Sequence, residues 1–172
     1  MSEIDVLLDQ HRGARHDASS IPIMPRLSTV VVSCLDARVD PVHLFGLAPG
    51  DAVVLRNAGG RVDEAVLRDV SLLRVFTAAA SGGSRSPELV VVHHTDCGTA
   101  RLGDPTVASA VAGPVGADAD AVAAMAVTDP WATVRHDVGV VRGRFPGQVA
   151  HGYVFDVATG ELLTAAECET TA

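Results

Sequence analysis

The sequence predicts an α/β fold in which a mainly parallel β-sheet is flanked by helices, and three observations support this. Several short runs are rich in valine and lack polar alternation, which is typical of strands buried on both faces of a sheet. Segments with helical spacing alternate with these runs, as in layered α/β folds. Hydrophobic residues make up 48% of the 172 residues, which is enough for the core of one domain of ordinary size.

The chain is predicted to consist of an N-terminal helix and arm followed by one folded domain. Residues 1–27 form the helix and arm, because this segment is polar and ends in the proline-punctuated run 21–25. Residues 28–172 form a single α/β domain. Its first three strands are the apolar runs 28–34, 51–56 and 88–92.

Two helices and two further strands complete this prediction. Apolar residues recur at helical spacing over 62–80, where Asp63 is a suitable N-cap and a glycine pair follows. The segment 98–128 is rich in alanine, glycine and valine and predicts no particular element. The remaining predicted elements are a helix over 129–144, a strand over 148–157 and a short return strand over 161–164.

The charge and cysteine content exclude several classes of protein. There are 21 acidic and 13 basic residues, every basic one an arginine, and the net charge of −8 argues against a nucleic-acid partner. Three cysteines are too few for a disulfide scaffold, so reduced thiols are expected. The apolar run that starts at Thr106 is interrupted by proline, glycine and aspartate, which argues against a membrane partner. These features predict a soluble, cytoplasmic protein.

Two cysteines and a histidine follow predicted strands and form a candidate metal site. Cys34 ends the first strand, and Cys97 lies just past the third, with His94 three residues before it on the same short loop. Two thiolates and an imidazole are a Zn²⁺ ligand set, and three protein ligands with an exchangeable fourth position are typical of catalytic zinc. The residues alone leave two alternatives open: ordinary buried side chains, or a structural site that Cys168 completes.

Asp36 and Arg38 follow Cys34 at alternate positions and add a candidate catalytic pair. Alternate residues beyond a strand end can face the same cleft. An arginine that grips a carboxylate bidentately fixes its orientation, and such a carboxylate can accept a hydrogen bond from a water molecule on the metal. The alternative is a surface ion pair without a function, worth about 0–1 kcal/mol.

Taken together, three motifs and a C-terminal run identify a known family. The motifs are Cys34-x-Asp36-x-Arg38, then Arg-Asn-Ala-Gly at 56–59, then His94-x-x-Cys97-Gly98, and the run is 151–162. The combination resembles the β-class carbonic anhydrases, in particular small bacterial members. The resemblance covers residues 28 to 163 and is weak between 99 and 128.

The resemblance implies a zinc enzyme that hydrates CO₂ reversibly to bicarbonate and a proton. Cys34, His94 and Cys97 would be the zinc ligands in a catalytic domain over 28–172. Asp36 and Arg38 would be a dyad beside a zinc-bound hydroxide, and Asp36 would become a fourth ligand in an inactive state at low pH. The family forms dimers with the cleft at the subunit interface, so a homodimer or homotetramer is expected.

Several other residues are predicted to support the site. Asn57, Gly59 and Gly98 are expected to have structural roles, the two glycines by allowing a close approach of the backbone. Asp96 is expected to cap the turn after the third strand, with proton acceptance as the alternative. Candidates for an apolar CO₂ slot are Val39, Phe45 and Leu47, and candidates for a proton relay are His43 and His93, although ordinary hydrogen bonding explains both histidines as well.

Two other functions are compatible with the same residues. One is the hydrolysis of carbonyl sulfide or carbon disulfide on the same scaffold. The other is a zinc-holding module without turnover, which would have a closed site with four ligands and would lose its fold when the metal is removed.

Overall fold

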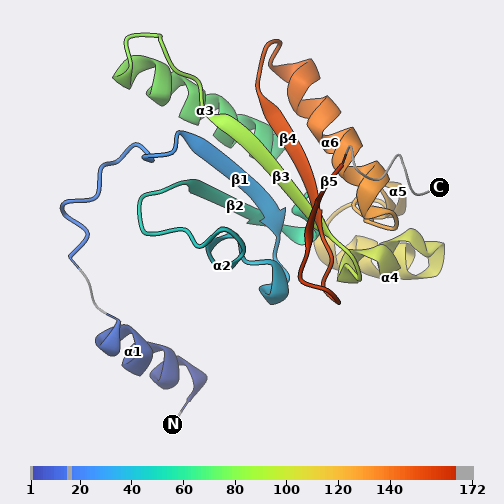
Figure 1. Ribbon diagram of the computed structural model, residues 1–172. Coiled ribbons are helices and arrows are strands. Elements are labelled where there is room, and N and C mark those ends of the chain that lie inside the picture. The colour runs from blue at the N-terminus through green and yellow to red at the C-terminus, as the bar shows by residue number, and fades with distance from the viewer. Residues whose placement is uncertain (1, 15–16, 166–172) are drawn as a thin grey trace.

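A five-stranded sheet dominates the computed structural model, which describes residues 2–14 and 17–165 (Figure 1). The strand order is β2-β1-β3-β4-β5, and β5 is antiparallel to β4 whereas the other neighbours are parallel. The predicted α/β fold with a mainly parallel sheet is therefore confirmed. The strands are β1 (Thr29–Cys34), β2 (Val53–Asn57), β3 (Glu88–His94), β4 (Ala150–Phe155) and β5 (Leu162–Thr164).

Helices α3 (Glu64–Ala80) and α6 (Pro130–Arg144) pack against one face of the sheet. Asp63 caps α3, as predicted, by accepting a hydrogen bond from Val66 N, and Asp129 caps α6 by accepting from Trp131 N and Ala132 N. Their apolar sides meet alternate residues of the central strands, so the core consists mainly of valine and leucine. Its members include Val30, Val32, Val66, Leu67, Val70, Leu89, Val91, Val134, Val138 and Val141.

The segment without a predicted element contains the 3₁₀ helix η3 (Gly98–Gly103) and the helices α4 (Pro105–Val115) and α5 (Ala119–Ala123). Aspartate side chains cap α4 and α5, but their alanine-rich composition provides no clear apolar stripe. The other short elements are η1 (Ala37–Val39), α2 (Pro41–Phe45) and η2 (Ala58–Gly60).

Helix α1 (Glu3–Gly13) begins with a capping box, in which Ser2 and Asp5 satisfy each other's backbone N–H groups. It contains no buried residue and lies apart from the sheet (Figure 1). None of the helices in the described part of the chain is both long and apolar enough to cross a membrane.

The parallel strands bring the predicted ligands to one edge of the sheet. Cys34 at the end of β1 is the register partner of Asn57 in β2. His94 at the end of β3 is the register partner of Phe155 in β4. The prediction that His94 lies on a loop is wrong, because β3 continues to His94 as its last residue. The strand itself therefore fixes the histidine, and only Cys97 is carried by the following turn.

Candidate metal centre

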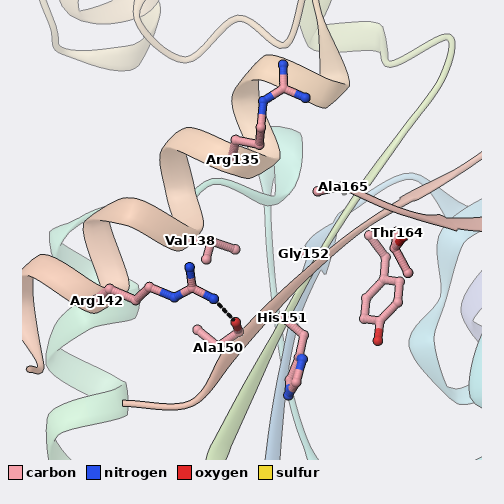
Figure 2. Close-up of a pocket in the computed structure, with 9 residues that line it drawn as sticks. Arg135, Val138, Arg142, Ala150, His151, Gly152, Thr164 and Ala165 are labelled. Carbon is pink, nitrogen blue, oxygen red and sulfur yellow. Dashed lines mark hydrogen bonds between the residues drawn. The ribbon is translucent and has the colours of Figure 1, made fainter. Parts of the chain in front are cut away.

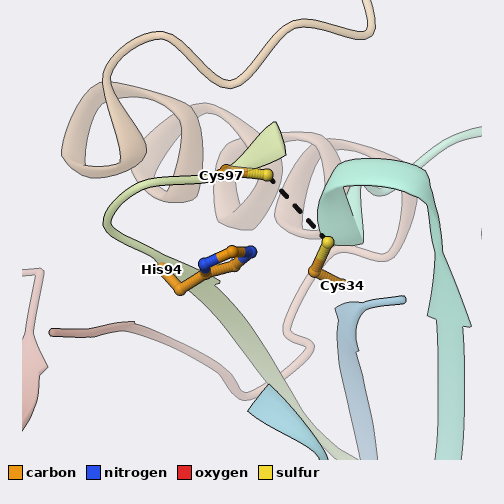
Figure 3. Close-up of side chains that lie close together, drawn as sticks. All are labelled: Cys34, His94 and Cys97. Carbon is orange, nitrogen blue, oxygen red and sulfur yellow. Dashed lines mark hydrogen bonds between the residues drawn. The ribbon is translucent and has the colours of Figure 1, made fainter. Parts of the chain in front are cut away.

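Cys34, His94 and Cys97 converge at the carboxyl edge of the sheet (Figure 3). One ligand atom from each residue lies within 4.8 Å of the other two, and all three residues are buried. The two Sγ atoms are 4.0 Å apart. Two sulfurs bound tetrahedrally to one Zn²⁺ at the usual bond length would be about 3.8 Å apart, so this spacing fits a zinc ion.

The hydrogen bonding of His94 also fits a metal ligand. Its Nδ1 lies 2.9 Å from the carbonyl oxygen of Thr95, and a carbonyl only accepts, so Nδ1 carries the proton. Nε2 is then a lone-pair donor, and this buried atom has no hydrogen-bond partner among the residues that the structure describes. A histidine ligand of a metal is typically held in this way by its other nitrogen.

The two thiols influence each other's ionisation. A hydrogen bond from Cys34 lowers the pKa of Cys97, and His94 and Thr99 act in the same direction, with the Thr99 hydroxyl 3.1 Å from the Cys97 sulfur. The same bond, together with burial, raises the pKa of Cys34. Without a metal one thiol therefore holds a proton, and a cation between the sulfurs favours loss of that proton.

Asp36 and Arg38 form the predicted pair next to this cluster. Arg38 donates from Nε to Oδ1 of Asp36 (3.0 Å) and from Nη2 to Oδ2 (2.6 Å). These hydrogen bonds hold the pKa of Asp36 well below its usual range, so that Asp36 is a carboxylate throughout the physiological pH range. Arg38 also donates from Nη1 to Asp96 (2.9 Å).

Asp96 is not the cap that the sequence predicted. Cys97 occupies the N-cap position of η3, but its side chain makes no capping hydrogen bond to the backbone. The Asp96 carboxylate instead pairs with Arg38. Asp96 has a φ of +55°, which few residues other than glycine adopt. This conformation lies between His94 and Cys97 in the chain, where the backbone turns sharply.

The turn after β2 packs closely against the backbone of Cys34. Asn57 accepts from Arg61 N and donates to Arg61 O (both 2.8 Å), which closes the turn. Gly59 has a φ of +80°, and an added Cβ would lie 3.1 Å from Thr99 Oγ1. The structural roles expected of Asn57 and Gly59 agree with this geometry. The closest approach, however, is at Gly60, where an added Cβ would lie 2.7 Å from the nitrogen of Cys34.

Gly98 does not have the close approach that the sequence predicted. An added Cβ would meet no atom of the described chain within 4 Å, and its φ lies outside the left-handed region. The cysteine loop is tight because of the backbone at Asp96, one residue before Cys97.

Apolar side chains surround the two cysteines. Val39 and Val127 are buried with Cys34 and Cys97 in a small separate core. Of the three candidates for an apolar slot, only Val39 belongs to it. Phe45 is 37% exposed and Leu47 is half-buried outside the group. The partly buried residues that do pack there are Leu44, Phe155 and Val157.

Neither candidate histidine relay is free in the cleft. His43 is exposed, with its nearest carboxylate, that of Asp40, 3.9 Å away. His93 is fully buried and bonded to Asp137. Cys168, the third cysteine, lies outside the described residues. A cavity of about 480 Å³ between α6 and β4 contains no predicted site residue (Figure 2).

Known proteins are similar to this chain in both sequence and fold. The family model described as carbonic anhydrase matches residues 29–123. Beta-carbonic anhydrase 1 of Mycobacterium tuberculosis is 31% identical over 146 residues, which cover 83% of this chain and 84% of that protein. The chain belongs to the β-carbonic anhydrase family. The resemblance inferred from the motifs is therefore confirmed.

Solved structures of β-carbonic anhydrases share the whole fold. The carbonic anhydrase from Streptococcus mutans superimposes with a TM-score of 0.77 at 29% identity, covering 96% of this chain and 98% of that one. A second relative has a different substrate in its name. Carbon disulfide hydrolase of an Acidianus strain is 38% identical over 78 residues, which are 45% of this chain and 35% of that protein.

Several residues around this β-carbonic anhydrase site were missed by the sequence argument. Thr99 contacts a cysteine sulfur, and Leu44 and Phe155 pack against the cluster. Arg56 donates to the carbonyl oxygens of Cys34 (2.9 Å) and Asp36 (2.8 Å) and so fixes the loop between them. Arg56 stands in the Arg-Asn-Ala-Gly motif, which was the only sequence signal for it.

Proposed function

We propose that this protein catalyses the reversible hydration of CO₂ to bicarbonate and a proton, with Zn²⁺ held by Cys34, His94 and Cys97. The observation that carries the proposal is the buried Cys-His-Cys cluster beside the Asp36–Arg38 pair in a member of the β-carbonic anhydrase family. When bound by three protein ligands, zinc supplies the Lewis acidity that ionises water near neutral pH.

Asp36 would act as a hydrogen-bond acceptor for the attacking water. Its low pKa excludes a role as a general acid near neutrality, because the carboxyl group does not hold a proton there. The bidentate contact with Arg38 fixes the direction of its lone pairs. An oriented acceptor of this kind selects one geometry of the nucleophile.

The apolar residues around the cysteines suit a small apolar substrate. Val39 and Val127 are buried together with the two cysteines, and Leu44 and Phe155 pack against this group. CO₂ has no net dipole and needs no charged recognition group. A dry wall beside an ionised water also strengthens electrostatic interactions at the reacting carbon.

Stopped-flow CO₂ hydration by zinc-analysed protein tests this function. We expect activity that rises with pH and a loss of about 10- to 100-fold in Asp36→Ala. Asp51→Asn is the matched control, because Asp51 also pairs with an arginine, Arg26, but at the amino ends of the strands. Inactivity of the wild-type protein at every pH, with one zinc per chain, would refute the proposal.

Sulfur substrates are the second candidate, because carbon disulfide hydrolase is among the relatives. Release of sulfide from carbonyl sulfide or carbon disulfide by the same samples separates this function from CO₂ hydration. A zinc-holding module without turnover is disfavoured. The described residues offer three ligands and an adjacent ion pair, whereas such a module needs four ligands. The cytoplasmic location stays a prediction.

A further inference from the structure

Asp137 is a buried carboxylate that no part of the proposed reaction uses. It lies on α6 with 1% of its surface exposed. Its Oδ2 accepts from Arg61 Nε (3.0 Å), Val62 N (3.2 Å) and His93 Nε2 (3.1 Å), and its Oδ1 accepts from Arg61 Nη2 (3.2 Å). The valines of α6 already pack in the core. A buried carboxylate with four hydrogen-bond donors is therefore not required to hold this helix against the sheet.

These hydrogen bonds reach two segments that carry the metal site. Arg61 ends the turn after β2, and its Nη1 also donates to the carbonyl oxygen of Ala124 (2.7 Å). Ala124 precedes Met125 and Val127, both of which lie within 3.3 Å of the position that a Cβ on Gly59 would take. The guanidinium thus holds the turn and the chain that covers it in one arrangement.

The turn in question touches the metal ligand Cys34 directly. Asn57, where the turn begins, is the register partner of Cys34 between β1 and β2. Gly60 packs on the Cys34 backbone with no room for a Cβ, and Leu35 N donates to Asn57 O (3.0 Å). A displacement of this turn would therefore move the backbone of Cys34, and the sulfur with it.

His93 connects the same carboxylate to the second metal-binding strand. It is fully buried, and His94 is the next residue of β3. The bond from His93 fixes the strand end against α6, from the side of the sheet opposite to the His94 side chain. Asp137 is thus the common partner of the two backbone segments that present Cys34 and His94.

We infer that Asp137 is a positioning residue for the metal centre, which sets the geometry of Cys34 and His94 through Arg61 and His93. This inference rests on the proposed metal site. An asparagine has the same shape but presents an NH₂ group to one of the four donors, so it would break part of the network and leave the Arg61 charge unpaired in a buried place.

The test uses Co²⁺ in place of zinc in the full-length protein, because the visible absorption of Co²⁺ depends on its ligand geometry. We expect Asp137→Asn to shift the cobalt bands and to weaken Zn²⁺ binding, measured by chelator competition, by about 10-fold or more. Arg61→Lys keeps the positive charge but loses the guanidinium that donates two hydrogen bonds to Asp137. This variant should shift the bands in the same way. Asp51→Asn is the control, and it should lower the melting temperature without changing the bands.

The outcomes distinguish the positioning role of Asp137 from the existence of the metal site. Asp137→Asn or Arg61→Lys protein with a lower melting temperature but wild-type bands and zinc affinity would overturn the inference, because Asp137 would then only stabilise the fold. If Asp137→Asn does not fold, Arg61→Lys decides alone. Wild-type protein that binds neither Co²⁺ nor Zn²⁺ would refute the metal site itself, and the inference with it.

Discussion

Arg38 makes hydrogen bonds to two carboxylates at once, and this sets its role. It holds Asp36 in a bidentate grip and also binds both the side chain and the carbonyl oxygen of Asp96. Asp96 stands between two metal-site residues in the chain, so Arg38 connects the loop after β1 to the loop after β3. The dyad and the cysteine loop are therefore fixed relative to each other by one side chain.

Replacing Arg38 should impair orientation rather than ionisation. Without Arg38 the pKa of Asp36 returns toward about 3.9, which is still far below neutrality. We therefore expect Arg38→Ala to lower CO₂ hydration by about 10- to 100-fold relative to the wild type, and by the same factor at every pH of a stopped-flow profile. Arg135→Ala, on the exposed surface of α6, is the control. A loss that disappears at alkaline pH, so that the variant reaches wild-type activity there, would contradict this role.

The same pair should matter little for stability near neutrality. Because the folded pKa of Asp36 is lowered, its contribution to stability is present above about pH 4 and disappears as the pH falls below that value. Arg38 is 48% exposed, so solvent screens the pair and limits it to about 0–1 kcal/mol. The Arg38→Ala protein should therefore remain folded in the activity assay.

At the scale of elements, the turn η2 is as much part of the site as the strands. It packs closely against Cys34 at Gly60, and the segment 125–127 lies next to it at Gly59. Two consecutive glycines, Gly59 and Gly60, adopt positive φ values there. The chain reverses direction within these residues, and only a backbone without side chains fits between Cys34 and Val127.

Gly60→Ala should therefore damage the metal site. An added Cβ would meet backbone atoms of Ser33 and Cys34 at 2.7–2.9 Å, in addition to the cost of about 1–2 kcal/mol for a left-handed conformation. Gly46→Ala is a matched control, because Gly46 has a φ of +59° but open space around its Cβ position. We expect Gly60→Ala to lose more stability in urea unfolding than Gly46→Ala, and to retain less zinc. Equal losses would show that the turn tolerates a shift.

The elements that the sequence predicted well are those with strong local patterns. The valine run before Cys34 and the capped helix after Asp63 have their own period and start signals, and both were found within two residues. The segment 98–128 has no such period, because alanine and glycine mark neither face of a helix. Asp137 was also missed, since its partners lie 44 to 76 residues away and no local pattern encodes them.

The whole molecule has apolar surface that a single chain does not bury. Ile4, Leu7 and Leu8 on α1 are 48–58% exposed, and Leu35 and Phe45 near the metal centre are also exposed. An isolated helix of 11 residues is only marginally stable in water, so α1 needs a surface to pack on. We propose that a second copy of the chain provides this surface, which fits the homodimer or homotetramer predicted from the sequence.

Light scattering coupled to size-exclusion chromatography tests this assembly. We expect the wild-type protein to elute with the mass of two or four chains, because burying Ile4, Leu7 and Leu8 on a partner contributes about 25 cal/mol for each Å² of apolar surface. Leu7→Glu should shift the mass toward one chain, since a carboxylate in such an interface would be unpaired. Gln10→Glu is the control, because it adds the same charge to α1 without removing an apolar side chain. A monomeric wild-type protein at micromolar concentration would refute the assembly, and an assembled Leu7→Glu protein would exclude α1 as its contact.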